Sequence, residues 1–236
     1  MLFDLELAGR LLFRPDAPPY KLPLPPGRNK LGIASERDAV LYVPPGLDAG
    51  KPVPLVVLFH GAGGSAEKIL PILEEQADFH HFLILAPQSM LVTWDIVIGG
   101  NGPDRERLDW ALHETAAHYA IDPRFLAFAG FSDGGSYALS MGLTNGALAS
   151  HIIAMSAGFM SVTMPEGEPH VFIAHGLHDE QLPIATSGRA NAAKLQEAGY
   201  EVRYVEFNGP HKPQPSIVAL AMNFFLADRV QWTGQV

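Results

Sequence analysis

Residues 125–135 read FLAFAGFSDGG, and this stretch decides the fold. The apolar run at its start is typical of a buried strand, and YALSMGL at 137–143 is typical of a helix. Gly130 and Gly134 let the chain reverse sharply, which places Ser132 in a strained turn with its hydroxyl above the sheet edge. The pattern therefore predicts a strand, a tight turn carrying serine, and a helix. Alone it is a weak signal, because glycine-rich turns around serine are common.

Strand-like and helix-like segments alternate along the rest of the chain. An edge strand is expected at 38–45, and near-continuous apolar runs predict buried strands at 53–59, 82–87, 151–157, 170–176 and 200–207. Helices are expected at 65–80, 103–120, 134–145, 184–198 and 214–228. Alternation of this kind specifies an α/β fold with a mostly parallel central sheet covered by helices on both faces.

Candidate functional residues follow several of these strands where each strand ends. Gly61, Ala62 and Gly63 follow the strand at 53–59, and Ser132 follows the strand at 125–131. Asp179 and His211 come after the next-to-last and last strands. Functional groups gather at the carboxyl edge of a parallel sheet, and the chain order Ser, Asp, His is the one expected of an α/β-hydrolase.

These residue types have complementary chemical roles. A serine hydroxyl becomes a good nucleophile when a neutral imidazole accepts its proton, so His211 is the expected base for Ser132. Asp179 would hold the other ring proton and stabilise the imidazolium. The backbone N–H groups of Ala62 and Asp133 are the expected oxyanion hole, and the Asp133 side chain must then point away from it.

Other interpretations of the same residues remain open at this stage. Asp179 could cap the helix expected at 184–198, and His211 could be an ordinary loop histidine. His175, His178 and Asp179 could be imagined as metal ligands, but a turn lacks the i, i+4 helical face of zinc sites, and we expect no metal.

A dinucleotide site is the rival enzyme class. Gly61-x-Gly63-x-x-Ala66 follows a strand and matches the fingerprint GxGxxA. That fingerprint expects an acidic residue at the end of the next strand, where residues 86–88 are Ala, Pro and Gln. We therefore expect no cofactor.

From 38 to 228 the chain resembles the α/β-hydrolase superfamily, and more narrowly its bacterial carboxylesterase/phospholipase branch, related to acyl-protein thioesterases and polyhydroxyalkanoate-depolymerase-like esterases. The resemblance rests on the segments LVVLFHGAGGS, TWDIVIGGNGPDRERLDWAL, AGFSDGGSYALSMGL, FIAHGLHDEQLPI and GPH. The resemblance implies a cofactor-free serine hydrolase that cleaves carboxylic esters through an acyl-enzyme on Ser132. Thioesterase relatives usually carry glutamine where this chain has Asp133. Thioesterase activity, lysophospholipase activity and a non-catalytic hydrolase-fold binding protein are the alternatives.

The expected pocket is open and shallow. Too few residues separate the strands at 151–157 and 170–176 to hold a cap domain, which favours short to medium acyl chains. Gly61, Gly63 and Trp94 are the expected substrate contacts, with the loop 87–103 as the rim. Trp94 could equally be a core anchor.

Composition limits the possible domain organisation, binding partners and location of the protein. With 236 residues and 47% hydrophobic content, the chain can form one catalytic domain at 36–236, preceded by a proline-rich arm at 1–35. The net charge of −9 argues against nucleic acid as a partner. The start lacks a signal-peptide pattern and no apolar run could span a bilayer, so we expect a soluble, cytoplasmic protein without membrane insertion. The chain contains no cysteine and therefore no disulfide. The expected binding partner is a small-molecule ester. For the oligomeric state, monomer and homodimer both stay open.

Overall fold

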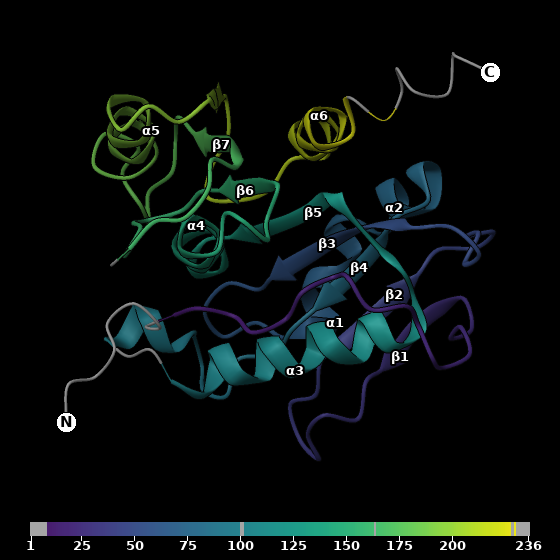
Figure 1. Ribbon diagram of the computed structural model, residues 1–236. Coiled ribbons are helices and arrows are strands. Elements are labelled where there is room, and N and C mark those ends of the chain that lie inside the picture. Colours follow the sequence, from purple (N-terminus) through teal and green to yellow (C-terminus); the bar gives the residue numbers. More distant parts are fainter. Residues whose placement is uncertain (1–8, 100–101, 163, 228, 230–236) are drawn as a thin grey trace.

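The computed structural model describes residues 9–227 and 229, apart from 100, 101 and 163. Its centre is an eight-stranded sheet in the order β1-β2-β4-β3-β5-β6-β7-β8 (Figure 1). The strands from β4 to β8 in this order run parallel, whereas β1 and β2 are antiparallel to their neighbours. The predicted α/β class with a mostly parallel sheet is confirmed. The strands are β1 (Gly27–Lys30), β2 (Val40–Val43), β3 (Val53–Phe59), β4 (Leu83–Ala86), β5 (Ile121–Phe131), β6 (His151–Met155), β7 (His170–Gly176) and β8 (Val202–Phe207).

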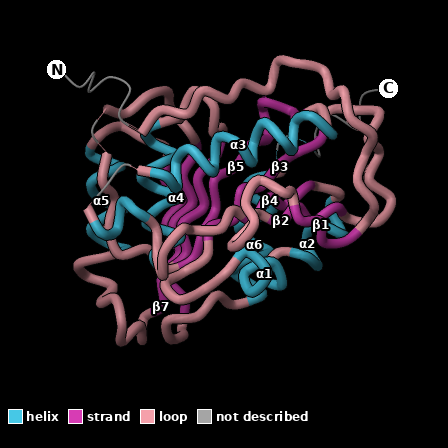
Figure 2. Tube along the Cα trace, turned by 90° about the horizontal axis from the view of Figure 1, so that it is seen from below, coloured by secondary structure: helices cyan, strands magenta, loops and turns pink. Residues whose placement is uncertain are grey.

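Helices cover both faces of the sheet, and Figure 2 shows the strands enclosed between them. The α-helices are α1 (Ala66–Ile69), α2 (Glu74–His80), α3 (Pro103–His118), α4 (Asp133–Thr144), α5 (Gly188–Glu197) and α6 (Pro215–Phe225). Short 3₁₀ segments are η2 (Leu70–Ile72) and η3 (Asp95–Ile98). No helix within the described ranges combines the length and apolarity needed to cross a membrane.

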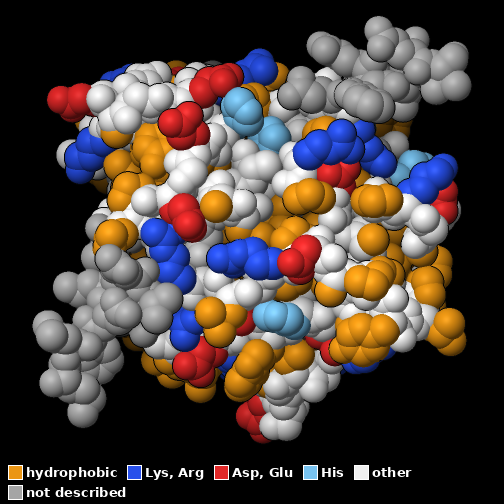
Figure 3. Space-filling model, viewed as in Figure 1, with side chains coloured by type: hydrophobic (Ala, Val, Ile, Leu, Met, Phe, Trp, Pro, Cys, Tyr) orange, Lys and Arg blue, Asp and Glu red, His pale blue; other side chains and the backbone are white. Residues whose placement is uncertain are grey.

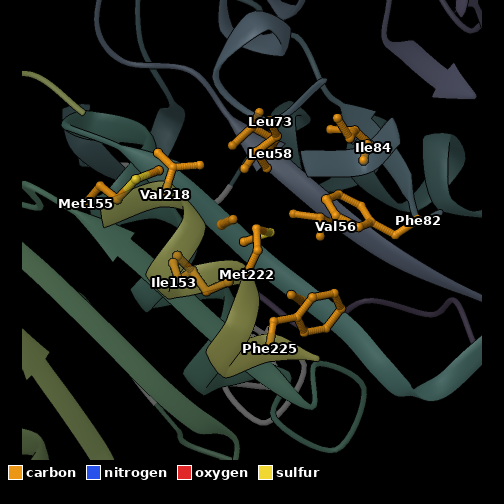
Figure 4. Close-up of a cluster of buried hydrophobic side chains, with 14 of the residues drawn as sticks. Val56, Leu58, Leu73, Phe82, Ile84, Ile153, Met155, Val218, Met222 and Phe225 are labelled. Carbon is orange, nitrogen blue, oxygen red and sulfur yellow. The ribbon is translucent and has the colours of Figure 1, made fainter. Parts of the chain in front are cut away.

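One face of the sheet packs against α1, α2 and α6. Figure 4 shows Val218, Met222 and Phe225 of α6 lying over apolar side chains of the sheet such as Val56 and Ile153. These side chains alternate along each strand with those that point to the other face, because successive strand residues face opposite sides. The sheet is therefore buried on both sides, which explains its continuous apolar runs.

The opposite face packs against α3, α4 and α5. Leu55, Val57 and Phe59 of β3 point to this side and meet Leu112 of α3 and Tyr137 of α4. The cluster under α5 is continuous with the same face of β6 and β7. Helix α4, which begins directly after Ser132, thus packs directly on the strands at the centre of the sheet.

The described part of the proline-rich arm, from residue 9, lies along α3 and then joins the sheet. Both Tyr20 and Lys21 donate backbone hydrogen bonds to the carbonyl of Ala117, at 2.9 and 2.8 Å. Residues 11 and 13 place buried side chains in the core beside α3. Strand β1 falls inside the segment 1–35 that we assigned to the arm, so this segment contributes to the sheet itself.

Two sequence expectations are corrected. The helix expected at 65–80 is interrupted by η2, because Pro71 has no N–H to continue the helical bonding. The segment at 38–45 is not the edge strand: β2 lies between β1 and β4. The true edge, β1, reads GRNK and lacks the apolar alternation by which a strand is recognised.

Charged side chains of both signs are interspersed with apolar ones over the face seen in Figure 3. Ion pairs on the exterior include Lys21 with Glu114 at 2.6 Å and Arg189 with Glu206 at 2.7 Å. Solvent screens such pairs, so they contribute little to the free energy of unfolding. Stability rests mainly on the two buried faces of the sheet.

Candidate active site

Ser132 occupies a sharp turn between β5 and α4, with φ 57° and ψ −123°. This conformation is unfavourable for a residue with a side chain, and it persists because the packing around it allows no alternative. A Cβ at Gly134 would lie 2.1 Å from the carbonyl oxygen of Phe59, and one at Gly130 would lie 2.1 Å from the carbonyl oxygen of Gly134. Both glycines are therefore required for the close approach of strand and helix that lifts Ser132 above the sheet edge.

The side chains of Ser132, His211 and Asp179 form a continuous hydrogen-bonded chain. His211 Nε2 lies 2.9 Å from Ser132 Oγ, and His211 Nδ1 lies 2.6 Å from Asp179 Oδ2. A carboxylate only accepts, so Nδ1 carries the proton and Nε2 is the acceptor for the serine hydroxyl. The Asp179 side chain is 0% exposed and that of His211 7%, with the Phe131 ring packed on the imidazole at a centroid distance of 4.8 Å.

Asp179 stays ionised because its oxygens are well bonded. Burial alone would raise its pKa, but hydrogen bonds from the Leu182 N–H and from His211 outweigh burial and lower it. Asp179 Oδ1 accepts from the backbone N–H groups of Gln181 and Leu182 at 3.0 and 2.8 Å. Helix α5 begins only at Gly188, so Asp179 does not cap it.

A further histidine contacts this carboxylate. His175 Nε2 lies 3.2 Å from Asp179 Oδ2 and 2.8 Å from the carbonyl oxygen of Leu182, so Nε2 carries the ring proton. The side chain is fully buried at the end of β7. Sequence reasoning considered His175 only as a metal ligand and missed this contact, although its i, i+4 spacing from Asp179 was visible. Within the described residues no group of three or more His, Asp or Glu side chains could hold a metal ion.

Two backbone N–H groups beside Ser132 have no protein acceptor among the described residues. Asp133 is the first residue of α4, where no preceding helical carbonyl is available. In the glycine-rich loop, Gly63 and Gly64 donate to the carbonyls of Val92 and Gly61, which leaves the Ala62 N–H unused. Gly61 lies against the nucleophile turn, since a Cβ there would be 3.3 Å from Ser132 Cβ.

The Asp133 carboxylate is held by a different loop. Asp133 Oδ2 accepts a 2.6 Å hydrogen bond from Thr93 Oγ1. Thr93 is buried in the segment that follows β4. This contact gives the charged side chain a fixed partner. That the side chain points away from the developing oxyanion stays a prediction.

His60 supports the glycine-rich loop. Its Nδ1 lies 2.8 Å from the carbonyl oxygen of Gly61, so Nδ1–H donates, and Nε2 accepts from the Gln88 amide at 3.0 Å and the Ser89 N–H at 3.3 Å. Burial lowers the pKa of His60, which favours the neutral ring that this bonding requires. Gln88 also accepts from the Ala66 N–H at 2.9 Å, so it ties the start of α1 to the same ring.

The expectation that Trp94 faces the substrate is wrong. Its side chain is 0% exposed and its indole N–H donates to the carbonyl of His60 at 2.8 Å. The ring stacks on Tyr137 at a centroid distance of 4.6 Å. The loop instead exposes Leu91 and Val92, which sequence reasoning did not single out.

A cavity of about 810 Å³ lies at the amino ends of the strands, whereas Ser132 lies at their carboxyl ends. Its lining includes His151 and His170, which begin β6 and β7, together with Arg124 and Asp122. None of Ser132, Asp179 and His211 belongs to it. Volume alone therefore does not mark the reactive centre of this fold.

Comparison with known proteins gives distant esterases. The chain is 24% identical over 213 residues to a probable feruloyl esterase C of Aspergillus terreus, covering 76% of this chain and 77% of that protein. The ferulic acid esterase structure from the anaerobic fungus Anaeromyces mucronatus matches with a TM-score of 0.63 at 19% identity, over 92% of this chain and 97% of that one.

A third relative is known in a covalently modified form. Thermogutta terrifontis esterase 2, in a structure phosphorylated by paraoxon, matches with a TM-score of 0.61 at 17% identity, covering 85% of this chain and 93% of that one. No family model matches the chain. The architecture is thus shared with these esterases, while the narrower branch suggested by the motifs stays a prediction.

Proposed function

We propose that this chain, which has the α/β-hydrolase fold, is a serine hydrolase of carboxylic esters with Ser132 as nucleophile. The observation that carries the proposal is the unbroken Ser132–His211–Asp179 hydrogen-bond chain beside a strained turn. The esterase names of the similar proteins support the same reaction class.

In the proposed reaction, His211 Nε2 accepts the Ser132 proton as Oγ attacks the ester carbonyl carbon. The C–O bond to the alcohol then breaks, and His211 returns the proton to the leaving oxygen. Water attacks the acyl-enzyme with the same base, which releases the acid and regenerates Ser132. Asp179 holds Nδ1–H throughout and stabilises the transient imidazolium.

Charge on the carbonyl oxygen would be stabilised by the N–H groups of Ala62 and Asp133. Both lack a protein acceptor among the described residues and both adjoin the nucleophile turn. Preorganised donors of this kind lower the barrier by roughly 3 kcal/mol each.

The substrates we propose are small esters with short to medium acyl chains. The segment 156–169 between β6 and β7 contains no helix or strand in its described part, so it builds no cap over the site. An uncapped site exposes much of a bound substrate to water, which limits the binding energy available from long chains.

A fluorophosphonate probe tests the proposal. Wild type should be labelled and should hydrolyse p-nitrophenyl butyrate, while Ser132→Ala should lose both properties. Ser216→Ala, at an exposed serine of α6, is the matched control and should behave as wild type. Labelling that persists in Ser132→Ala would remove Ser132 as nucleophile, and an unlabelled, inactive wild type would favour a non-catalytic binding protein.

A further inference from the structure

Leu91 and Val92 are exposed apolar side chains on a loop that is otherwise tightly bonded. Their exposed fractions are 57% and 66%. The carbonyl of Leu91 accepts from the Arg37 guanidinium at 2.7 Å and from Ser89 Oγ at 2.7 Å, and the Met90 N–H donates to Asp104 at 2.7 Å. These polar groups are thus satisfied by the protein, while the apolar side chains of Leu91 and Val92 face solvent, as does that of Met90 at 43% exposure.

The loop is hydrogen-bonded close to both proposed oxyanion donors: to the neighbour of Ala62, and to the side chain of Asp133. The carbonyl of Val92 accepts from Gly63, which adjoins Ala62, at 2.8 Å. The hydroxyl of Thr93 donates to Asp133, itself the second donor, at 2.6 Å. The exposed side chains at 91 and 92 therefore stand at the rim of the site that surrounds the reacting carbonyl.

The order of strands indicates which part of an ester reaches this rim. The leaving oxygen must lie beside His211, which follows β8, because His211 returns the proton to it. Residues 91 and 92 follow β4, on the other side of Ser132 in the sheet order β4-β3-β5-β6-β7-β8. The leaving group therefore lies on the side of Ser132 away from residues 91 and 92, and the acyl chain is the part of the ester that can reach them.

We propose that Leu91 and Val92 form an acyl-contact surface that makes the enzyme prefer butyrate or hexanoate esters over acetate. The inference rests on the proposed esterase function and adds the part of the substrate that the chain selects. Full burial of a methylene against apolar side chains favours binding about fourfold, so two additional methylenes that are partly buried should raise kcat/KM about fivefold, below the limit of about sixteenfold for full burial.

The test uses two ester series on the full chain. In p-nitrophenyl acetate, butyrate and hexanoate only the acyl group varies; in ethyl, butyl and hexyl acetate only the alcohol varies. Leu91→Ser/Val92→Ser should lower the butyrate-to-acetate ratio of kcat/KM at least threefold and leave the dependence on alcohol length unchanged. Leu12→Ser, at a 71% exposed leucine of the arm, is the matched control and should keep the wild-type ratios.

Two results would overturn the proposal while leaving the esterase function intact. In one, wild type turns over esters but the acyl-length ratio is the same in the double variant. In the other, only the alcohol series responds, which would assign the surface to the leaving group. An unlabelled wild type without turnover would instead remove the esterase function and this inference with it. Circular dichroism separates misfolding from a true change in ratio, and the single variants Leu91→Ser and Val92→Ser repeat the test if the double variant unfolds.

Discussion

Thr93 Oγ1 donates a 2.6 Å hydrogen bond to the carboxylate of Asp133, the residue that directly follows Ser132. The bond joins the loop after β4 to the first turn of α4. It lies at the positive end of the helix, where a carboxylate is also favourable. The loop that lines the site and the turn that carries the nucleophile are therefore held as one unit.

Thr93→Val should lower kcat/KM for all esters about tenfold, because loss of the bond frees the Asp133 carboxylate and loosens the Asp133 N–H. The loss should appear mainly in kcat, since the bond positions the turn and does not touch the bulk of the substrate. Thr93→Ser restores the hydroxyl and should recover most of the activity. A Thr93→Val enzyme with kcat within twofold of wild type would show that the bond has no role in positioning.

His175→Phe should lower kcat about tenfold, because the turn at 179–182 that positions the Asp179 carboxylate loses its hydrogen bond from the His175 ring to the Leu182 carbonyl. His175→Gln offers an N–H donor at a similar reach and should recover part of kcat. A purely structural role would lower the melting temperature of both variants while kcat per folded molecule stayed the same. Active-site titration with the fluorophosphonate supplies that normalisation.

Gly134→Ala should destabilise the fold by at least about 3 kcal/mol, because the new methyl group would overlap the backbone carbonyl of Phe59. Gly50→Ala is the control, since the nearest atom to a Cβ there is the side-chain oxygen of Asp48 at 3.2 Å, on the surface. Urea unfolding followed by tryptophan fluorescence measures both. Equal midpoints for Gly134→Ala and wild type would contradict the close packing at the turn.

His60 should make the free energy of unfolding depend on pH below neutrality. Burial lowers its pKa in the folded state, so between the lowered value and the ordinary value near 6.5 the unfolded chain binds more protons. Its contribution to stability is thus full above about pH 6.5 and is lost as pH falls through the folded-state pKa. His60→Gln should reduce the slope of unfolding free energy between pH 7.5 and pH 5. If the unfolding free energy of wild type and His60→Gln depended on pH with the same slope, His60 would not be the source of this pH dependence.

Local sequence patterns predicted much of the fold, and the reasons lie in particular residues. The apolar run of β3 and the glycines at 130 and 134 act through nearest neighbours, so their structural effect can be read without knowing the fold. Strand β1 escaped prediction because GRNK becomes a strand only by pairing with β2. The break at Pro71 within the helix expected at 65–80 is also a local effect, because proline lacks the N–H that the helix needs.

Some residues of the candidate site could likewise be predicted from local patterns, and others could not. Ser132, Asp179 and His211 could be named from the sequence because parallel strands deliver their ends to one edge, and the structure places their side chains within hydrogen-bonding distance. The burial of Trp94 could not be read in advance, since an aromatic residue in a glycine-rich loop fits a rim as well as a core.

The sequence by itself determined the strand–turn–helix at Ser132 and the order of polar residues along the sheet edge, because backbone sterics and hydrophobic periodicity are local properties. Only the tertiary structure decided that Thr93 bonds Asp133, that His175 supports Asp179, and that Leu91 and Val92 face solvent beside the site. The order of strands in the sheet brings Thr93 to Asp133 and places Leu91 and Val92 beside the site, and no local pattern carries that information. His175 and Asp179 are only four residues apart, but their side chains meet because of the path of the turn between them, which the sequence pattern did not specify.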